Sequence, residues 1–131
     1  MKYMLMFCHE PDAGPRFEDL PADEQRRMLQ AILNWRNEFK SKFVDPGMRL
    51  GESSTATTVR RRGDQYLVTD GPFVEGAEVV GGYSIVEVAD LDEAIRIVKA
   101  FPACPTAEIR PILESEQPEA FSATGVLSET R

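Results

Sequence analysis

Residues 69–73 read Thr-Asp-Gly-Pro-Phe and lie between two apolar segments of strand length. A hairpin turn needs only one or two of Asp, Gly and Pro, whereas this run places all three in front of a large aromatic residue. Gly71 can adopt backbone angles that are closed to other residues, and Pro72 fixes its own φ and restricts the residue before it. The run therefore predicts a rigid corner that holds the Asp70 carboxylate at the end of a strand. The carboxylate is either a catalytic or binding group or a cap of its own turn.

Hydrophobic periodicity predicts an order of strand, helix, two or three strands, strand, helix and strand. The first run is continuously apolar, which favours a central strand covered on both faces. The two segments around Gly63-Asp64 read as a hairpin. The glycine pair at 81–82 indicates a bulge or a close approach of the backbone to another group. The strands are expected at residues 2–8, 48–52, 55–61, 65–69, 83–88 and 107–113.

Two amphipathic helices are expected between these strands. The first begins at Pro21 and ends before Pro46-Gly47, and the second begins with a capping box formed by Asp90 and Glu93. The first apolar stripe consists of Met28, Ile32, Trp35 and Phe39, widened by Leu29 and Leu33. The second stripe consists of Leu91, Ala94, Ile95, Val98 and Phe101.

These elements predict an α+β fold in which two helices cover one face of an antiparallel sheet. The ferredoxin-like arrangement fits the order, with the hairpin of residues 55–69 inserted or extended. The second face of such a sheet needs a cover, because a large apolar patch would otherwise meet water. We therefore expect a homodimer. A single domain is expected over residues 1–113, followed by an acidic tail, 114–131, that is either mobile or packed on a partner subunit.

The charge balance limits the partners that the chain can bind. It carries 22 acidic and 15 basic side chains, a net charge of −7, so direct nucleic-acid binding is not expected. The basic triplet at 60–62 is interpreted as a solvated strand end. No apolar run reaches 18 residues, and the N-terminus lacks the features of a signal peptide. We expect a cytoplasmic protein with reduced Cys8 and Cys104 thiols.

The common catalytic and cofactor motifs are absent from the sequence. There is no C-x-x-C, H-E-x-x-H, G-x-S-x-G or phosphate-binding glycine loop, and His9 is the single histidine. No metal or cofactor is therefore expected. Any chemistry would have to be acid–base chemistry.

Two residues at strand ends are candidates for such chemistry. His9 ends the first strand and Asp70 ends another, so both side chains could point toward the same end of the sheet. Asp70 would act as the base or would orient His9, which can move protons near neutral pH. A solvated loop histidine is the alternative for His9. The expected pocket lies between the sheet and the partner subunit, with these two residues on its rim.

Four further residues are candidates for substrate binding. Arg49 and Arg60 lie on strands that flank the corner, where a guanidinium holds either an acidic substrate or a structural carboxylate. Phe73 and Tyr83 are aromatic residues of the core or of an interface and could line the same pocket.

Five blocks of sequence, in this order and spacing, resemble the YCII-related family in its DGPF-domain branch. They are residues 1–6, 66–75, 80–88, 90–94 and 107–112. The resemblance runs from residue 1 to about residue 113. It implies a ferredoxin-like fold and a dimeric α/β-barrel, formed by two sheets that face each other, in a family whose members are mostly of unknown function.

The resemblance leaves two functions open. Relatives in the wider family carry a His–Asp pair, and one branch is a dehydrochlorinase that acts on a chlorinated hydroxyquinol, although its histidine does not clearly align with His9. This implies a small enzyme with lyase-like or dehydrohalogenase-like chemistry on a small organic molecule. DGPF-type proteins are also commonly encoded beside sigma factors of the extracytoplasmic-function class. This implies the alternative, a non-catalytic module that binds a ligand or a protein partner in sigma-factor signalling.

Overall fold

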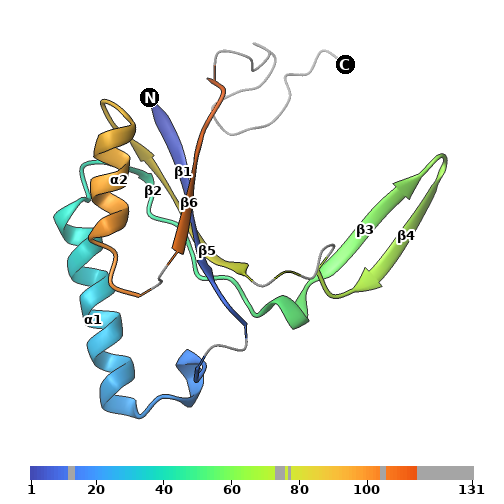
Figure 1. Ribbon diagram of the computed structural model, residues 1–131, viewed down its shortest axis with the longest axis horizontal. Coiled ribbons are helices and arrows are strands. Elements are labelled where there is room, and N and C mark those ends of the chain that lie inside the picture. The colour runs from blue at the N-terminus through green and yellow to red at the C-terminus, as the bar shows by residue number, and fades with distance from the viewer. Residues whose placement is uncertain (12–13, 73–75, 77, 104–105, 115–131) are drawn as a thin grey trace.

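The protein is an α+β fold in which a four-stranded antiparallel sheet carries two helices on one face (Figure 1). The computed structural model describes residues 1–11, 14–72, 76, 78–103 and 106–114. The strand order is β2-β5-β1-β6, which is the ferredoxin-like topology. The sheet consists of β1 (Lys2–His9), β2 (Phe43–Asp45), β5 (Val79–Glu87) and β6 (Thr106–Pro111), and the helices are α1 (Ala22–Glu38) and α2 (Leu91–Lys99).

The predicted hairpin forms a second, separate sheet of two strands. It consists of β3 (Thr57–Arg62) and β4 (Gln65–Asp70), and it projects from the end of the body where β1 ends and β5 begins (Figure 1). Gly63 takes a φ of +61° in the first position of its two-residue turn, as a type II′ turn requires. Short 3-10 helices at Phe17–Asp19 and Ser53–Thr55 lie in the connecting segments.

The central position of β1 is confirmed, because this strand pairs with both β5 and β6. The strand predicted at residues 48–52 is wrong. The segment that pairs with β5 as a strand is β2, which ends at Asp45. Within residues 48–52 the pairing with β5 is limited to an isolated bridge between Arg49 and Gly82. A tight turn separates the two stretches. Gly47 has a φ of +84° and donates its N–H to Asp45 Oδ1 at 2.8 Å.

The core lies between the sheet and the helices. Alternate residues of β1 face the helices, so Leu5 and its neighbours two positions away are buried. The Phe7 ring stacks on Phe101 at 4.0 Å and meets Trp35 edge-on at 5.7 Å. The Trp35 indole N–H donates to the Ile97 carbonyl at 2.9 Å and so joins the two helices. The buried apolar residues are Tyr3, Leu5, Phe7, Trp35, Val86, Val88, Ala94 and Ile97.

The helical stripes are narrower than the periodicity predicted. Leu29 and Leu33 are exposed, because each lies about 100° further around α1 than the buried stripe. In α2, Ile97 is fully buried although the prediction omitted it, and Leu91 is exposed. The predicted capping box is confirmed in its first half, with Asp90 Oδ1 accepting from the Glu93 N–H at 2.9 Å.

The sheet face opposite the helices is here called the outer face. It carries Met4, Met6, Cys8, Tyr83 and Ile85, all of which are half-buried. In the described ranges no helix lies on this face (Figure 1). No described helix is long and apolar enough to cross a bilayer. Residues 115–131, most of the predicted tail, lie outside the described residues, and Glu114 pairs with the Lys2 ammonium at 2.8 Å.

Candidate functional site

A bulge at the start of β5 positions His9. The register places Phe7 opposite Gly82 and Cys8 opposite Val80, so Gly81 is the extra residue. A Cβ added at Gly81 would lie 2.7 Å from His9 Nδ1 and 2.8 Å from Cε1. The imidazole therefore rests directly against the glycine backbone, and a side chain at this position would displace it. The bulge and the close approach predicted from the glycine pair are both confirmed.

The second glycine brings another strand-like segment against β5. A Cβ at Gly82 would lie 3.2 Å from the Met48 carbonyl oxygen. The Leu50 N–H donates to the Gly81 carbonyl at 2.8 Å, and the Tyr83 N–H donates to the Met48 carbonyl at 3.3 Å. The contact of His9 with Gly81 and the bridge from Arg49 to Gly82 place these two predicted site residues beside the segment of β5 that leads into Tyr83.

The Arg49 side chain is engaged by residues of the loop before α1. Its Nη2 lies 2.6 Å from Glu18 Oε1, and its guanidinium lies 5.0 Å from the centre of the Phe17 ring. Two hydrogen bonds lower the pKa of Glu18. The larger effect comes from its own backbone amide, and the next comes from the Arg49 guanidinium. The structural ion pair considered as the alternative for Arg49 is therefore present.

Asp70 and Arg60 lie away from this group, on the hairpin. Asp70 ends β4 opposite Thr57 and is exposed, while Arg60 is exposed opposite Leu67. Within the described residues, no hydrogen bond reaches the Asp70 carboxylate, and none joins it to His9. Phe73 lies outside the described residues.

The corner after Asp70 is closed by bonds that do not use its side chain. The Gly71 N–H donates to the Ala56 carbonyl at 2.7 Å, and the Thr58 hydroxyl donates to the Gly71 carbonyl at 2.7 Å. Gly71 has a φ of +96°, as expected for a residue that needs the left-handed region. The corner is thus held by its backbone, and the Asp70 carboxylate stays exposed beside it.

Cys8 precedes His9 in β1, lies on the outer face and was not predicted as a site residue. It is a free, half-buried thiol whose Sγ donates to the Met6 carbonyl at 3.5 Å. Burial raises its pKa, and the nearby Glu78 and Glu108 carboxylates raise it further. The thiol is therefore protonated at neutral pH and is a weak nucleophile. Alternation along β1 is the sequence signal that places Cys8 with Met4 and Met6, on the face opposite Phe7.

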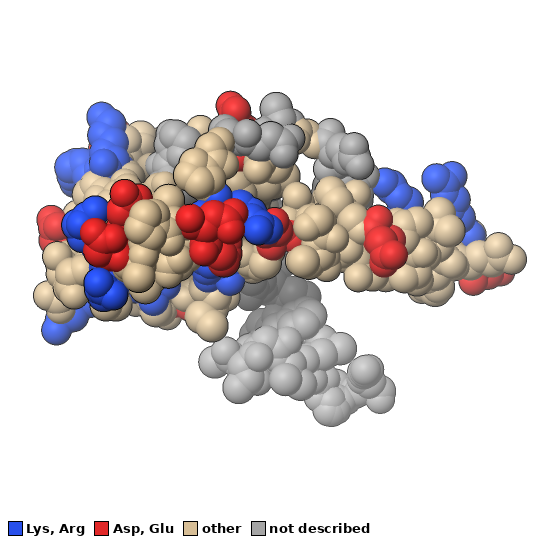
Figure 2. Space-filling view, turned by 90° about the horizontal axis from the view of Figure 1, so that it is seen from below, with Lys and Arg blue, Asp and Glu red and all other residues tan. Residues whose placement is uncertain are grey.

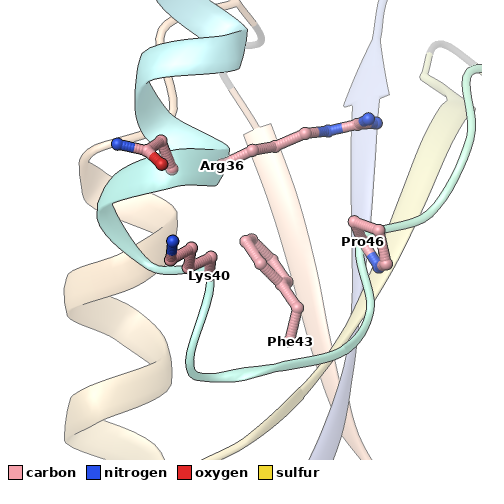
Figure 3. A pocket seen from close by; sticks show the side chains of 5 residues that line it. Arg36, Lys40, Phe43 and Pro46 are labelled. Carbon is pink, nitrogen blue, oxygen red and sulfur yellow. The ribbon is translucent and has the colours of Figure 1, made fainter.

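An open pocket of about 400 Å³ lies elsewhere, between the end of α1 and the turn around β2 (Figure 3). In Figure 3 the Arg36 side chain extends toward Pro46, whereas the Lys40 side chain lies on the other side of the Phe43 ring. Arg36 Nη2 donates to the Gly47 carbonyl at 3.3 Å. The cationic ends do not converge on one point, so this pocket does not form an anion site. The lining residues are Arg36, Asn37, Lys40, Phe43 and Pro46, and they include none of the predicted site residues.

Comparison with known proteins extends the sequence resemblance. The model of the YCII-related domain matches residues 1–116. An uncharacterized protein of Rhizobium meliloti (strain 1021) is 29% identical over 94 residues, which cover 69% of this chain and 76% of that protein. In the described ranges, no three His, Cys, Asp or Glu side chains are arranged to hold a metal ion.

Proposed function

The chain belongs to the YCII-related family, and we propose that it is a homodimer that binds a small organic molecule between two facing sheets and acts on it by acid–base chemistry. The observation that carries the proposal is the position of His9. The single histidine of the chain lies at the end of β1, directly against the Gly81 bulge.

The outer face supports the dimer. Met4, Met6, Tyr83 and Ile85 lie on the two central strands, β1 and β5, yet each keeps part of its surface exposed in the single chain. Burying apolar surface is the main favourable term in association. A second copy that laid its own outer face on this one would bury the same residues from both sides.

The chemistry would use His9 and Asp70. A neutral imidazole accepts a proton from a carbon or oxygen atom of the ligand near neutral pH. The electron pair left behind would then expel a leaving group, as in a lyase or dehydrohalogenase. In this scheme Asp70 is the base or orients His9, and Arg49, Arg60, Phe73 and Tyr83 hold the ligand. The site would face a space between subunits, and the protein would work in the cytoplasm.

A non-catalytic binding module is the second candidate. It is favoured by the environment of Asp70, which is exposed and accepts no hydrogen bond within the described residues. Catalytic carboxylates are more often found in closed surroundings with a partner side chain. In that case the same surfaces would bind a ligand or a protein of sigma-factor signalling without turnover.

The test is a thermal-shift screen of small organic molecules, followed by calorimetric titration of each hit. We expect at least one hit whose Kd rises about tenfold or more in both His9→Gln and Asp70→Asn. Asp64→Asn at the hairpin turn is the matched control and should leave the Kd unchanged. Turnover of a hit that is lost in both variants would establish catalysis. Hits that bind all three variants equally, or a protein that sediments as a monomer at micromolar concentration, would overturn the proposal.

A further inference from the structure

Among the described strands, β3 and β4 pair only with each other. Their hairpin leaves the body as a narrow extension on which basic side chains gather (Figure 2). Its two ends are held together at the base by the hydrogen bonds that Gly71 makes with Ala56 and Thr58. An isolated two-stranded ribbon is marginally stable in water. A hairpin of six-residue strands in this position therefore needs a partner surface.

One face of the hairpin carries an apolar stripe. The register pairs Val59 with Val68 and Arg61 with Tyr66, and directly paired residues lie on the same face. The exposed fractions are 59% for Val59, 64% for Tyr66 and 63% for Val68. Asp70 lies at the base of this face. Apolar side chains that adjoin on one surface and stay exposed mark an interaction site.

The charge of the hairpin is opposite to that of the remaining chain. Residues 57–70 contain three arginines and two aspartates, whereas the whole chain has a net charge of −7. The Glu78 and Glu108 carboxylates lie near Cys8, at the His9 end of the outer face, where Glu108 also pairs with Arg110 at 3.5 Å. A second copy of this chain therefore offers the hairpin an acidic surface beside an apolar one, formed by Met6 and Tyr83.

From these observations we propose that the hairpin is an arm that docks on a second copy of the chain. Its stripe of Val59, Tyr66 and Val68 packs on the His9 end of the partner copy's outer face, and Arg61 faces the carboxylates there. This inference rests on the homodimer proposed above and extends it. Docking would also remove Asp70 from bulk water, because Asp70 lies on the same face of the arm.

A second copy fits the arm better than a nucleic acid does. Three arginines attract phosphates, but the net charge of −7 repels a polyanion as a whole. The negative charge of the body attracts the basic arm of another copy. Electrostatic attraction of this kind contributes orientation and association rate, while the apolar stripe supplies the burial.

The primary test compares two adjacent residues on opposite faces of β4. Val68→Asp places a carboxylate in the stripe, and Leu67→Asp places the same group on the other face, where Leu67 is 50% exposed. Sedimentation equilibrium over a range of concentrations measures the dimer Kd. We expect Val68→Asp to raise the Kd at least tenfold and Leu67→Asp to leave it within about twofold. Circular dichroism confirms that both variants are folded.

Charge exchange tests where the arm docks. Arg61→Glu should weaken the dimer several-fold, and Glu108→Arg in the same chain should restore part of the loss. The rate of Cys8 alkylation in a Cys104→Ser background gives a second measurement. Docking should slow alkylation as the protein concentration rises, and Val68→Asp should remove this protection.

Two outcomes distinguish failure of arm docking from failure of dimerization. If Met4→Asp dissociates the dimer while Val68→Asp and Leu67→Asp have equal effects, the sheets pair but the arm does not dock, and the inference is wrong. If the unmodified protein is a monomer throughout, the proposed homodimer fails and the arm fails with it. Binding of a DNA or RNA oligonucleotide that depends on Arg61 and Val68 without any change in self-association would also overturn the inference.

Discussion

The body of the protein and its hairpin use the same kinds of residues with opposite results. In β1, every second side chain from Tyr3 to Phe7 is buried beneath two helices. In β4, Tyr66, Leu67 and Val68 are exposed to solvent, and they lie on both faces of the hairpin. Both strands are rich in apolar and aromatic residues, so composition does not distinguish them. The difference is a second layer of structure: among the described residues, helices cover one face of β1, whereas no helix covers β4 (Figure 1).

This contrast assigns the two regions different tasks. Full burial of a leucine or isoleucine side chain contributes about 1.5–3 kcal/mol relative to exposure, so Leu5 and Ile97 hold the body together. The exposed hairpin residues contribute little to folding of a single chain. Their apolar surface is available for association, as the proposed arm requires.

The largest expected effect compares one leucine from each region. Leu5→Ala should lower the free energy of unfolding by about 2–5 kcal/mol, because it leaves a cavity where the side chain is completely buried. Leu67→Ala should change it by less than about 0.5 kcal/mol, because that side chain is half exposed and lies on the face opposite the stripe. Urea unfolding monitored by circular dichroism measures both. Equal losses would mean that the hairpin is part of the folded core.

Sequence signals formed by residues close together in the chain were sufficient to predict much of the fold. The continuous apolar run of β1, the two-residue turn at Gly63-Asp64 and the Asp90–Glu93 capping pair each predicted what the structure contains. The bond between Asp90 and Glu93 spans one helical turn, so no distant residue is needed to form it.

Features that depend on distant residues were not predictable in the same way. The pairing of Arg49 with Glu18 joins residues 31 positions apart and forms only once the loop before α1 lies beside β5. The burial of Ile97 depends on where α2 meets the sheet. Alternation in β3 and β4 predicts two strands, but it does not say whether either face is covered. The glycine pair did predict the bulge, because a missing side chain leaves a gap that another group can occupy.

A smaller effect is expected when the hairpin turn is strained. Gly63 has a φ of +61°, and an L-residue side chain costs about 1–2 kcal/mol in the left-handed region. Because β3 and β4 form a sheet separate from the four-stranded sheet of the body, Gly63→Ala should open the hairpin locally and leave the global unfolding free energy nearly unchanged. Hydrogen exchange should therefore accelerate roughly tenfold at hairpin amides and remain constant in β1. Equal acceleration in both strands would show that the two regions unfold as one unit.

The smallest expected effect concerns a surface carboxylate of the body, at the start of α2. The Ala89 N–H and then the Lys42 ammonium lower the pKa of Glu93 below 4.5. The charged form is therefore favoured by folding, so its stabilising contribution is present above the unfolded pKa and is lost as the pH falls through the lower folded pKa. Glu93→Gln should destabilise the protein slightly at pH 7, and the difference should vanish in acid. Thermal unfolding between pH 7 and pH 3 measures it.

A double variant shows whether Lys42 acts through Glu93. If the ammonium stabilises the fold by pairing with this carboxylate at 3.1 Å, Lys42→Gln and Glu93→Gln should be less than additive at pH 7 and additive in acid. The Ala89 bond predicts that Glu93→Gln keeps part of its effect in the absence of Lys42, because the backbone amide still favours the charged oxygen. A difference between Glu93→Gln and the unmodified protein that grows as the pH falls would contradict this assignment. The hairpin provides the contrast, since the Asp70 carboxylate lacks such a donor within the described residues.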